Sequence, residues 1–435
     1  MTSPQAPPDG PRQFPVRSTS LRDLNLLCWG ALLTCFVIPF SIVILQSHAP
    51  PNGDFAGFYS WGRIIHEYPS ADFYNYPLLQ KMCYSVQPRD AGYGPLPYPP
   101  YAGLVFVPFA RLPYWAAYLL WSLISIGLYL AGLWMILSRF LPVHAHARSL
   151  LIGLAFCFAP FLVDTAANGQ LAAVGFLALA AAVREDDLGY AFRSGLAISV
   201  CSYKPTLLVL VLPMLLLTRR WRALAGFAVG TAAMSAAATA LAGRDVWRGF
   251  ISTLLSFGHA SVKAKSATIL ILAKYVDLTS FAHAVPGGQS LPVLLAVVAV
   301  GGAALAALVR MWWVSTRLDR EFQPLMWAAT LTWTLVLNLY VPVYDTILVV
   351  LAVLLMAESV RRIDDRPLKL WFHWNWALLL ACSWFAVTLA AHTGVQVLTL
   401  MLISLGLLQL RLLWKLKRFA NKAGAASMYI AHGMH

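Results

Sequence analysis

The chain has 435 residues, of which 59% are hydrophobic and only 11% are charged. Soluble globular proteins carry about 25% charged residues, so this composition excludes a soluble enzyme. The formal net charge of +14 would suggest nucleic acid in a soluble protein. Membrane topology accounts for it better here, and we expect no nucleic-acid partner.

The N-terminal segment, residues 1–23, is rich in proline and polar residues, and we expect it to be disordered and cytoplasmic. The first apolar block follows at residues 24–45 and is too long for a signal-peptide core, so it predicts a membrane anchor. A long loop, residues 47–113, comes next. It contains an apolar stretch, residues 98–110, that is too short to cross a bilayer and is expected to be re-entrant or interfacial.

Further apolar blocks, many as long as a bilayer is thick, run to the end of the chain. With the first block they predict an all-α polytopic membrane protein with about 12 transmembrane helices (range 10–13). Residues 24–418 then form one integral membrane domain, interrupted by a second loop segment at residues 243–290 and followed by a tail at residues 419–435. The later predicted spans are residues 114–138, 149–163, 171–183, 194–203, 206–218, 223–241, 291–313, 324–340, 346–357, 371–391 and 395–410.

The distribution of Lys and Arg predicts the orientation of this topology. These residues are more frequent in the loops on the side of both termini. Because cytoplasmic loops carry the excess of Lys and Arg, we expect both termini and the tail 419–435 in the cytoplasm. The segments 47–113 and 243–290 then face the periplasm.

Two places break the predicted spans into short blocks: Asn168-Gly169-Gln170 and Lys204-Pro205. Interrupted spans are tolerated only where the freed backbone groups line protein or a water-filled cavity. These breaks therefore predict a polar cavity that opens to the periplasmic side.

Asp54 follows the first apolar block closely, with an aromatic run behind it that includes Tyr59. A carboxylate at a partly dry interface is a candidate general base, because loss of water raises its pKa towards the working range. A turn aspartate beside Gly53 explains the same residue without catalysis. Tyr59 and the other loop aromatics could stack on a sugar or anchor the loop at the lipid headgroups.

Lys204 stands between apolar runs, where an ammonium is costly unless it meets an anion such as a lipid phosphate. Snorkelling to the membrane surface or pairing with Asp164 would also satisfy it. Asp164 shares one outward turn with Asn168 and Gln170. These polar residues could bind substrate or only cap the turn.

Two further outward segments carry polar candidates. Tyr344-Asp345 forms a turn just before a predicted span, and it fits a binding role or a simple turn equally well. His259, Lys263 and Lys265 form a basic stretch that could meet lipid phosphates, although a solvated charge cluster explains it too.

The chain lacks the motifs of nucleotide-dependent chemistry. It has no Walker loop, Rossmann glycine fingerprint, HExxH motif or Asp-x-Asp motif, and the nearest acidic run, Glu185-Asp186-Asp187, falls on the cytoplasmic side. Six cysteines without a CxxC pair predict neither a disulfide nor a metal cluster. An enzyme on the periplasmic face would meet no nucleotide sugar, so its donor would have to be lipid-linked.

The ordered motifs resemble the polytopic glycosyltransferases of the C-type fold, in particular glycosyltransferase family 87. The match runs from Asn52 to Trp221, and beyond that point it rests on Tyr344-Asp345. It is carried by Asp54-Phe55 with Phe58-Tyr59, Tyr98-Pro99-Pro100, Gly169-Gln170, Lys204-Pro205 and Arg219-Arg220.

The resemblance implies transfer of a sugar, typically mannose, from a polyprenyl-phosphate donor to a lipid or glycan acceptor, with inversion, at the periplasmic face of the bacterial inner membrane. It assigns catalysis to Asp54. The leaving lipid phosphate needs no proton, so one carboxylate suffices, cations offset the phosphate charge, and we expect no cofactor and no obligatory metal. The substrate-binding candidates are Lys204, Tyr59, Gln170, His259, Lys263, Tyr344 and Asp345.

Two other functions fit the composition. A transporter or flippase of lipid-linked sugars would show paired interruptions in two related halves, and Lys204-Pro205 has no counterpart in the second half. A non-catalytic scaffold would leave Asp54 and Lys204 without a purpose. The sequence therefore favours the enzyme over both.

Overall fold

The computed structural model describes residues 18–47, 53–87, 94–265, 272–285, 290–315 and 322–432. Within these ranges the chain is helical, and its only β pairing is an isolated antiparallel bridge between Tyr275 and Pro342. Helices satisfy their backbone groups internally, which a chain this apolar needs inside a bilayer. The structure thus confirms the predicted all-α class.

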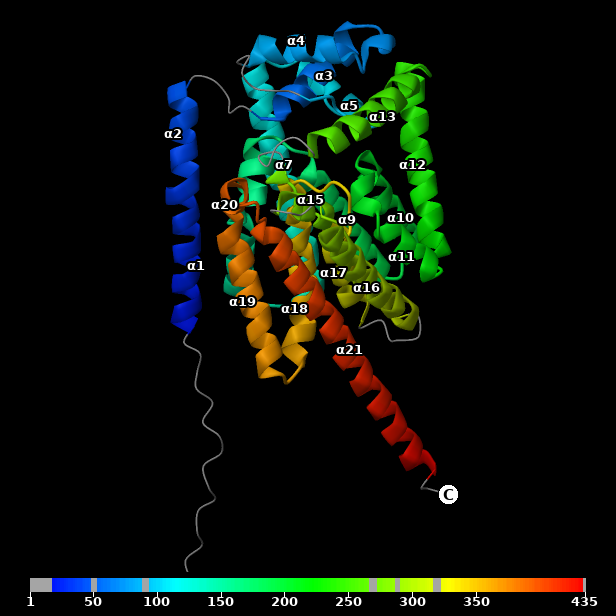
Figure 1. Cartoon of the computed structure of the whole chain (residues 1–435). Helices are drawn as coiled ribbons and strands as arrows, with labels where there is room; N and C mark the ends of the chain where they lie inside the picture. The colour runs from blue at the N-terminus through cyan, green and yellow to red at the C-terminus, as the bar shows by residue number, and fades with distance from the viewer. Residues whose placement is uncertain are drawn as a thin grey trace, which may run out of the picture.

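The helices are named in chain order (Figure 1). They are α1 (Ser18–Leu32), η1 (Leu33–Val37), α2 (Ile38–Ser47), α3 (Phe55–Glu67), η2 (Ser70–Asp72), α4 (Tyr76–Val86), α5 (Pro100–Leu104), α6 (Val107–Ala110), α7 (Tyr114–Phe140), α8 (Ala145–Phe156), η3 (Pro160–Ala167), α9 (Ala172–Asp187), α10 (Ala191–Val200), η4 (Cys201–Tyr203), η5 (Pro205–Leu208), α11 (Val211–Leu217), α12 (Trp221–Ala242), α13 (Val246–Lys265), α15 (Leu278–Ala284), α16 (Leu291–Ser315), α17 (Gln323–Val336), η7 (Val343–Ile347), α18 (Leu348–Arg362), α19 (Arg366–Ser383), α20 (Ala386–Thr393) and α21 (Val397–His432).

Six helices of the described chain are long and apolar enough to cross a membrane, or up to eight if each bent helix pair is one span. The pair α8 and η3 bends by 66°, and the pair α19 and α20 bends by 77°. Several predicted spans coincide with helices too short to cross a bilayer alone, since α9 has 16 residues and α10 has 10. The chain is therefore a polytopic membrane protein, and the count of about 12 spans is not confirmed.

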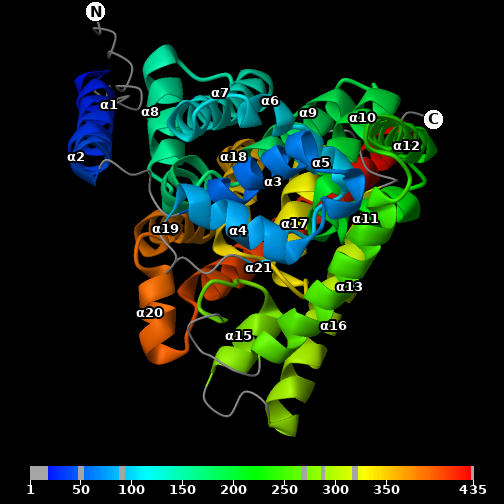
Figure 2. The same cartoon turned by 90° about the horizontal axis from the view of Figure 1, so that it is seen from above.

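The two ends of the described chain leave the bundle. The helix formed by α1, η1 and α2 stands at the edge of the molecule beside α8 (Figures 1 and 2). It begins at Ser18, inside the segment predicted to be disordered, and residues 1–17 lie outside the description. At the other end, α21 projects away from the bundle and continues into the predicted tail 419–435 (Figure 1).

Helices α3, α4, α5 and α6 cover one end of the bundle (Figures 1 and 2). They come from the predicted first loop, and the apolar stretch 98–110 forms the two short helices α5 and α6. Both pack on α3, and Phe106 between them stacks on Phe58 of α3 with ring centroids 4.9 Å apart. The Trp61 indole of α3 also donates to the carbonyl of Phe73, just after η2, at 2.8 Å. This packing fixes α3, whose N-terminus carries Asp54.

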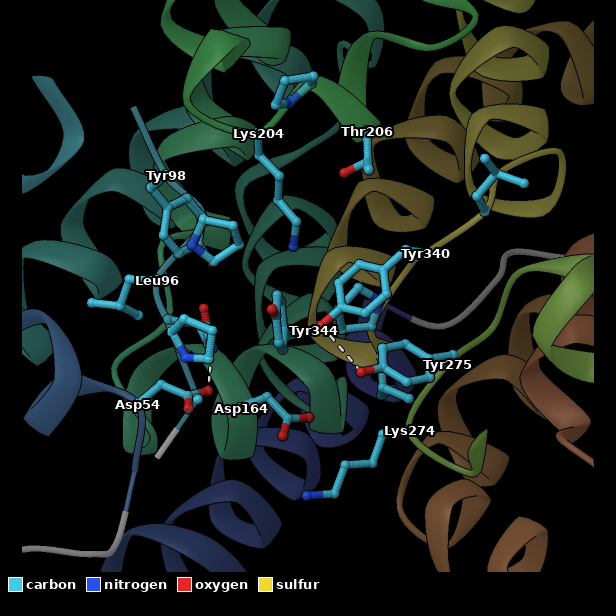
Figure 3. A pocket seen from close by; sticks show the side chains of 18 of the residues that line it. Asp54, Leu96, Tyr98, Asp164, Lys204, Thr206, Lys274, Tyr275, Tyr340 and Tyr344 are labelled. Carbon is cyan, nitrogen blue, oxygen red and sulfur yellow. Dashed lines mark hydrogen bonds between the residues drawn. The ribbon is translucent and has the colours of Figure 1, made fainter. Parts of the chain in front are cut away.

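The centre of the bundle is formed by α17, whose residues are almost all buried, and by the buried first part of α18, residues 348–356. Between them the chain leaves the helical path at residues 337–342 and re-enters through η7. A break of this kind exposes backbone and side chains inside the protein rather than to lipid. It brings Tyr340 and Tyr344 to the same region as Asp54 and Lys204 (Figure 3).

Candidate functional site

A cavity of about 1180 Å³ is lined by the turn at the N-terminus of α3, by the segments before α5 and after η3, and by the segment between α17 and η7, among others. Both sequence breaks open onto it, through Asn168 and Gln170 on one wall and Lys204 and Pro205 on another. The lining residues are Gly53, Asp54, Phe58, Gly94–Tyr98, Asp164, Asn168, Gln170, Tyr203–Thr206, Leu254, Lys274, Tyr275, Thr279, His283, Leu294, Leu339, Tyr340, Pro342–Tyr344 and Val387. The structure therefore contains a cavity where the breaks predicted one, and its lining is a mixture of polar and apolar side chains.

The turn that carries Asp54 docks on the first sequence break. The backbone N–H of Phe55 donates to the Asn168 carbonyl at 3.0 Å, and a side chain at Gly53 would meet the Asn168 backbone at 2.8 Å. Gly53 therefore permits a close backbone approach. Two short motifs from distant parts of the sequence form one rigid wall in this way.

Gly169 makes the same contact possible from the other side. Its φ is +76°, a left-handed conformation that glycine adopts without strain, and a Cβ there would lie 2.5 Å from the Cβ of Phe55. The segment is held by α7, because the Trp121 indole donates to the Gly169 carbonyl at 2.9 Å and the Tyr118 hydroxyl donates to the Ala167 carbonyl at 2.7 Å. The preceding helix η3 is a π-helix, a rare form that often occurs at functional sites.

Asp54 is exposed to the cavity, and Gln170 donates a hydrogen bond to its carboxylate. Dense protein on the remaining sides removes water and raises the pKa of Asp54 above its ordinary value. The Gln170 hydrogen bond and the positive charges of Lys274 and Lys204 lower this pKa in part. The result is a carboxylate that is both accessible and more basic than a surface aspartate.

Lys204 is buried and forms an ion pair with Asp345, with 2.6 Å between Nζ and Oδ2. Its ammonium also lies 4.3 Å from the ring centroid of Tyr344, within cation–π range. The alternative predicted partner, Asp164, is not the one observed. The structure thus brings three predicted site residues together, with Asp345 behind the cavity wall and the other two on it.

The model of glycosyltransferase family 87 matches residues 96–342, more than half of the chain. The chain belongs to glycosyltransferase family 87. No curated protein and no solved structure matches the chain. The matched segment contains Gln170 and Lys204, extends beyond Trp221, and begins after Asp54. Family 87 membership makes the chain a membrane glycosyltransferase rather than a transporter or a scaffold.

One predicted binding residue of this family 87 enzyme does not face the cavity. Tyr59 is buried, donates its hydroxyl to the Leu112 carbonyl at 2.9 Å and packs against Tyr114. Residues three to four apart share a helix face, so Phe58 follows Asp54 onto the cavity side while Tyr59 turns away. Tyr59 therefore does not line the cavity, where its predicted role in substrate binding would place it. It anchors the covering helices instead.

Three other predicted residues cannot be placed. His259, Lys263 and Lys265 belong to α13, but their side chains lie outside the described residues. Another part of the same helix, Leu254, does reach the cavity.

Four residues on the cavity wall were not predicted from the sequence: Lys274, Tyr275, Tyr340 and His283. Tyr275 donates to the Tyr340 hydroxyl at 3.1 Å, which joins the two tyrosines into one wall. The sequence pointed only weakly to Lys274 and Tyr275 as site residues. They follow a short apolar run in the predicted second loop, and no spacing relates them to the breaks at Asn168-Gly169-Gln170 and Lys204-Pro205. The bridge to Pro342 and backbone hydrogen bonds to Val341 and Val343 bring this segment to the site.

The acidic run Glu185-Asp186-Asp187 lies outside the cavity in this family 87 enzyme. Each acid has a basic partner: Glu185 meets Arg184, Asp186 meets Arg220, and Asp187 meets Arg139. Asp186 also accepts from the Trp327 indole at 2.7 Å. The ion pairs of this run therefore connect the end of α9 with α7 and with the start of α12. Among the described residues, no group of three or more His, Cys, Asp or Glu is placed to hold a metal ion.

Proposed function

We propose that this membrane glycosyltransferase transfers a sugar, mannose by the family resemblance, from a polyprenyl-phosphate donor to a hydroxyl of a lipid or glycan acceptor, with Asp54 as general base. One observation supports this most: Asp54 presents an accessible carboxylate of raised pKa on the wall of a cavity of about 1180 Å³. A base needs both the access and the basicity.

In the proposed reaction, Asp54 takes the proton of the acceptor hydroxyl as its oxygen attacks the anomeric carbon of the donor. The bond from that carbon to the phosphate oxygen breaks, and its electron pair leaves with the polyprenyl phosphate. Attack from the side opposite the leaving group inverts the configuration. Asp54 then passes the proton to water, and the phosphate group needs none.

The neighbouring residues take supporting roles in this proposal. Gln170 orients Asp54 through the hydrogen bond that it donates. Lys204 lies on the donor side of the cavity and is held there by Asp345, while Tyr344 forms the wall beside them. His259 and Lys263 on α13 stay candidates for contact with a lipid phosphate.

Apolar residues of the cavity support a lipid-linked donor. Leu254 on α13, Leu294 on α16 and Leu339 all line the cavity. The side chains of Leu254 and Leu339 are also 42% and 74% exposed. In a bilayer these side chains would meet lipid tails, so a polyprenyl chain could pass from the membrane to the cavity without crossing water.

The topology belongs to the same proposal. We place the cavity on the periplasmic face of a bacterial inner membrane, with both termini cytoplasmic. We also propose about 12 spans in a C-type fold, within one membrane domain of residues 24–418. The excess of Lys and Arg in the loops on the opposite side supports this orientation.

The donor class can be tested with purified protein in nanodiscs and a membrane lipid extract as the source of acceptor. Radiolabelled mannose is supplied either as polyprenyl-phosphate mannose or as a nucleotide sugar. We expect label in the acceptor fraction only with the lipid-linked donor. Transfer from the nucleotide sugar at an equal rate would contradict the proposal.

A further inference from the structure

Two ammonium groups line the cavity, those of Lys204 and Lys274. The remaining basic residue on the wall, His283, has its Nδ1 2.8 Å from the Thr279 carbonyl of its own helix. Among the residues whose side chains the structure describes, one or both of the lysines are therefore placed to meet a phosphate bound beside Asp54.

The charge of Lys204 is already matched inside the protein. Its partner Asp345 has a side chain that is only 1% exposed and lies 2.6 Å away. A buried pair of this kind is costly to separate, because the carboxylate left behind would be an uncompensated buried charge. Lys204 can donate a hydrogen bond to a ligand, but its net charge is not available to balance one.

Lys274 differs from Lys204 both in its exposure and in its ion pairing. Its side chain is exposed to the cavity, and it forms no ion pair with any residue that the structure describes. It interacts electrostatically with both Asp54 and Asp164, and Figure 3 shows it on their side of the cavity.

The backbone under Lys274 is firmly held. Its carbonyl accepts from the Val343 N–H at 2.9 Å, and the Val276 N–H donates to the Val341 carbonyl at 2.9 Å. The carbonyl of Ala273 accepts from the Gln396 side chain at 2.6 Å. A fixed backbone with a free, flexible ammonium suits a residue that binds a charged ligand.

The charges around the cavity make such a cation necessary. Lys204 and Asp345 cancel, which leaves Asp54 and Asp164 against Lys274 alone among the described residues. A donor phosphate entering here brings a further negative charge. Like charges repel strongly in a partly dry site, so the phosphate needs a cation beside it, and Lys274 is the cavity lysine that forms no ion pair among the described residues.

From this arrangement we propose that Lys274 binds the phosphate of the lipid-linked donor and stabilises it as it leaves. The proposal rests on the donor class given under the proposed function. When the bond to the anomeric carbon breaks, the phosphodiester with one negative charge becomes a monoester with two. Lys274 offsets the added charge, and the effect appears in the transition state as well as in binding.

The test measures binding of farnesyl phosphate and of farnesol to the purified full chain. We expect Lys274→Gln to weaken binding of farnesyl phosphate tenfold or more and to leave binding of farnesol unchanged. Lys274→Arg, which keeps the charge, should stay close to the parent. The matched control is Lys81→Gln, which removes an exposed charge on α4 outside the cavity and should change neither affinity.

Four outcomes would overturn the proposal. Lys274→Gln could bind farnesyl phosphate as tightly as the parent, or it could lose farnesol equally, which would mark a structural role. Displacement of farnesyl phosphate by excess phosphatidylglycerol would assign Lys274 to a membrane headgroup. A parent protein that binds farnesyl phosphate no better than farnesol would instead refute the donor class, and Lys274 with it.

Discussion

Asp54 and Gln170 are 116 residues apart in the sequence, yet they share a hydrogen bond at the cavity wall. Asp54 also interacts with the charges of Lys204 and Lys274, which come from two further segments. The basicity of this carboxylate is therefore a property of four distant segments rather than of its own turn.

The raised pKa of Asp54 predicts a pH profile. A general base must be ionised, so transfer is present above the pKa of Asp54 in the folded protein and is lost as the pH falls through it. Because burial raises this pKa, we expect the acidic limb of kcat/KM above the value of about 3.9 for an ordinary aspartate. The positive charge of Lys274 lowers the pKa of Asp54, so the acidic limb of the Lys274→Gln variant should lie at higher pH than that of the parent. A limb that moves to lower pH would contradict this assignment.

The pair of Lys204 and Asp345 predicts a difference in stability between two variants. Lys204→Met leaves the Asp345 carboxylate buried without a partner, which typically costs about 3 to 5 kcal/mol. The double variant Lys204→Met with Asp345→Asn removes both charges and should recover most of this loss. Thermal unfolding in detergent measures both, and equal melting temperatures for the two variants would show that the pair does not stabilise the fold.

At the scale of elements, the site depends on the docking of the α3 N-terminus against the residues after η3. Gly169 is the closest point, since a Cβ there would lie 2.5 Å from that of Phe55. The α3 turn cannot move aside freely, because the Phe55 ring is packed against Tyr118 and Phe106. A side chain at this position should displace Asp54 from the cavity wall.

We therefore expect Gly169→Ala to lower transfer at least tenfold while the protein still inserts and folds. Gly243→Ala is the matched control: its φ is +82°, but the nearest atom to an added Cβ is 3.8 Å away. Both variants introduce backbone strain, and only the first introduces a clash. If both lose activity equally, strain rather than the contact with Phe55 is responsible.

The same element shows how far the sequence could predict the site. The breaks at Asn168-Gly169-Gln170 and Lys204-Pro205 predicted a cavity, because irregular backbone in an apolar chain needs protein or water around it. They could not predict that Asp345 pairs with Lys204 or that Lys274 reaches the cavity. Those contacts depend on tertiary packing between segments with no common spacing.

Tertiary packing also explains why the all-α fold class was predictable from the sequence and the lengths of the helices were not. Composition alone requires helices in a bilayer, but an apolar run does not reveal where tertiary contacts end a helix. The block predicted at residues 149–163 is split by a bend of 66° between α8 and η3. The block predicted at residues 324–340 ends as a helix at Val336 and continues as the cavity wall.

At the scale of the whole molecule, the two ends of the bundle differ. One end is covered by α3 and α4 above the cavity, and the opposite end carries the junction of α18 and α19 (Figure 1). The acids of Glu185-Asp186-Asp187 are all paired with arginines away from the cavity. The end covered by α3 and α4 is therefore the candidate for catalysis, and this fits the proposed placement of the cavity on the periplasmic side.

The orientation can be tested with single cysteines at Ser85 and Arg366 in a background without the six native cysteines. Both positions are exposed, Ser85 on α4 and Arg366 at the start of α19. We expect a membrane-impermeant maleimide to label intact cells at Ser85 and not at Arg366. The reverse pattern would place the cavity on the cytoplasmic side and remove the argument for a lipid-linked donor.

The most direct test of the account is the transfer rate of Asp54→Asn with a donor and acceptor pair that the parent accepts. Asparagine keeps the size of the side chain but cannot take a proton, and general-base catalysis is typically worth about a hundred- to ten-thousand-fold. We predict a loss in this range with insertion, folding and polyprenyl-phosphate binding retained. Asp245→Asn, the same change at an exposed acid outside the cavity, should leave the rate unaltered. Transfer by Asp54→Asn at the parent rate would contradict the account and move the base to another acid.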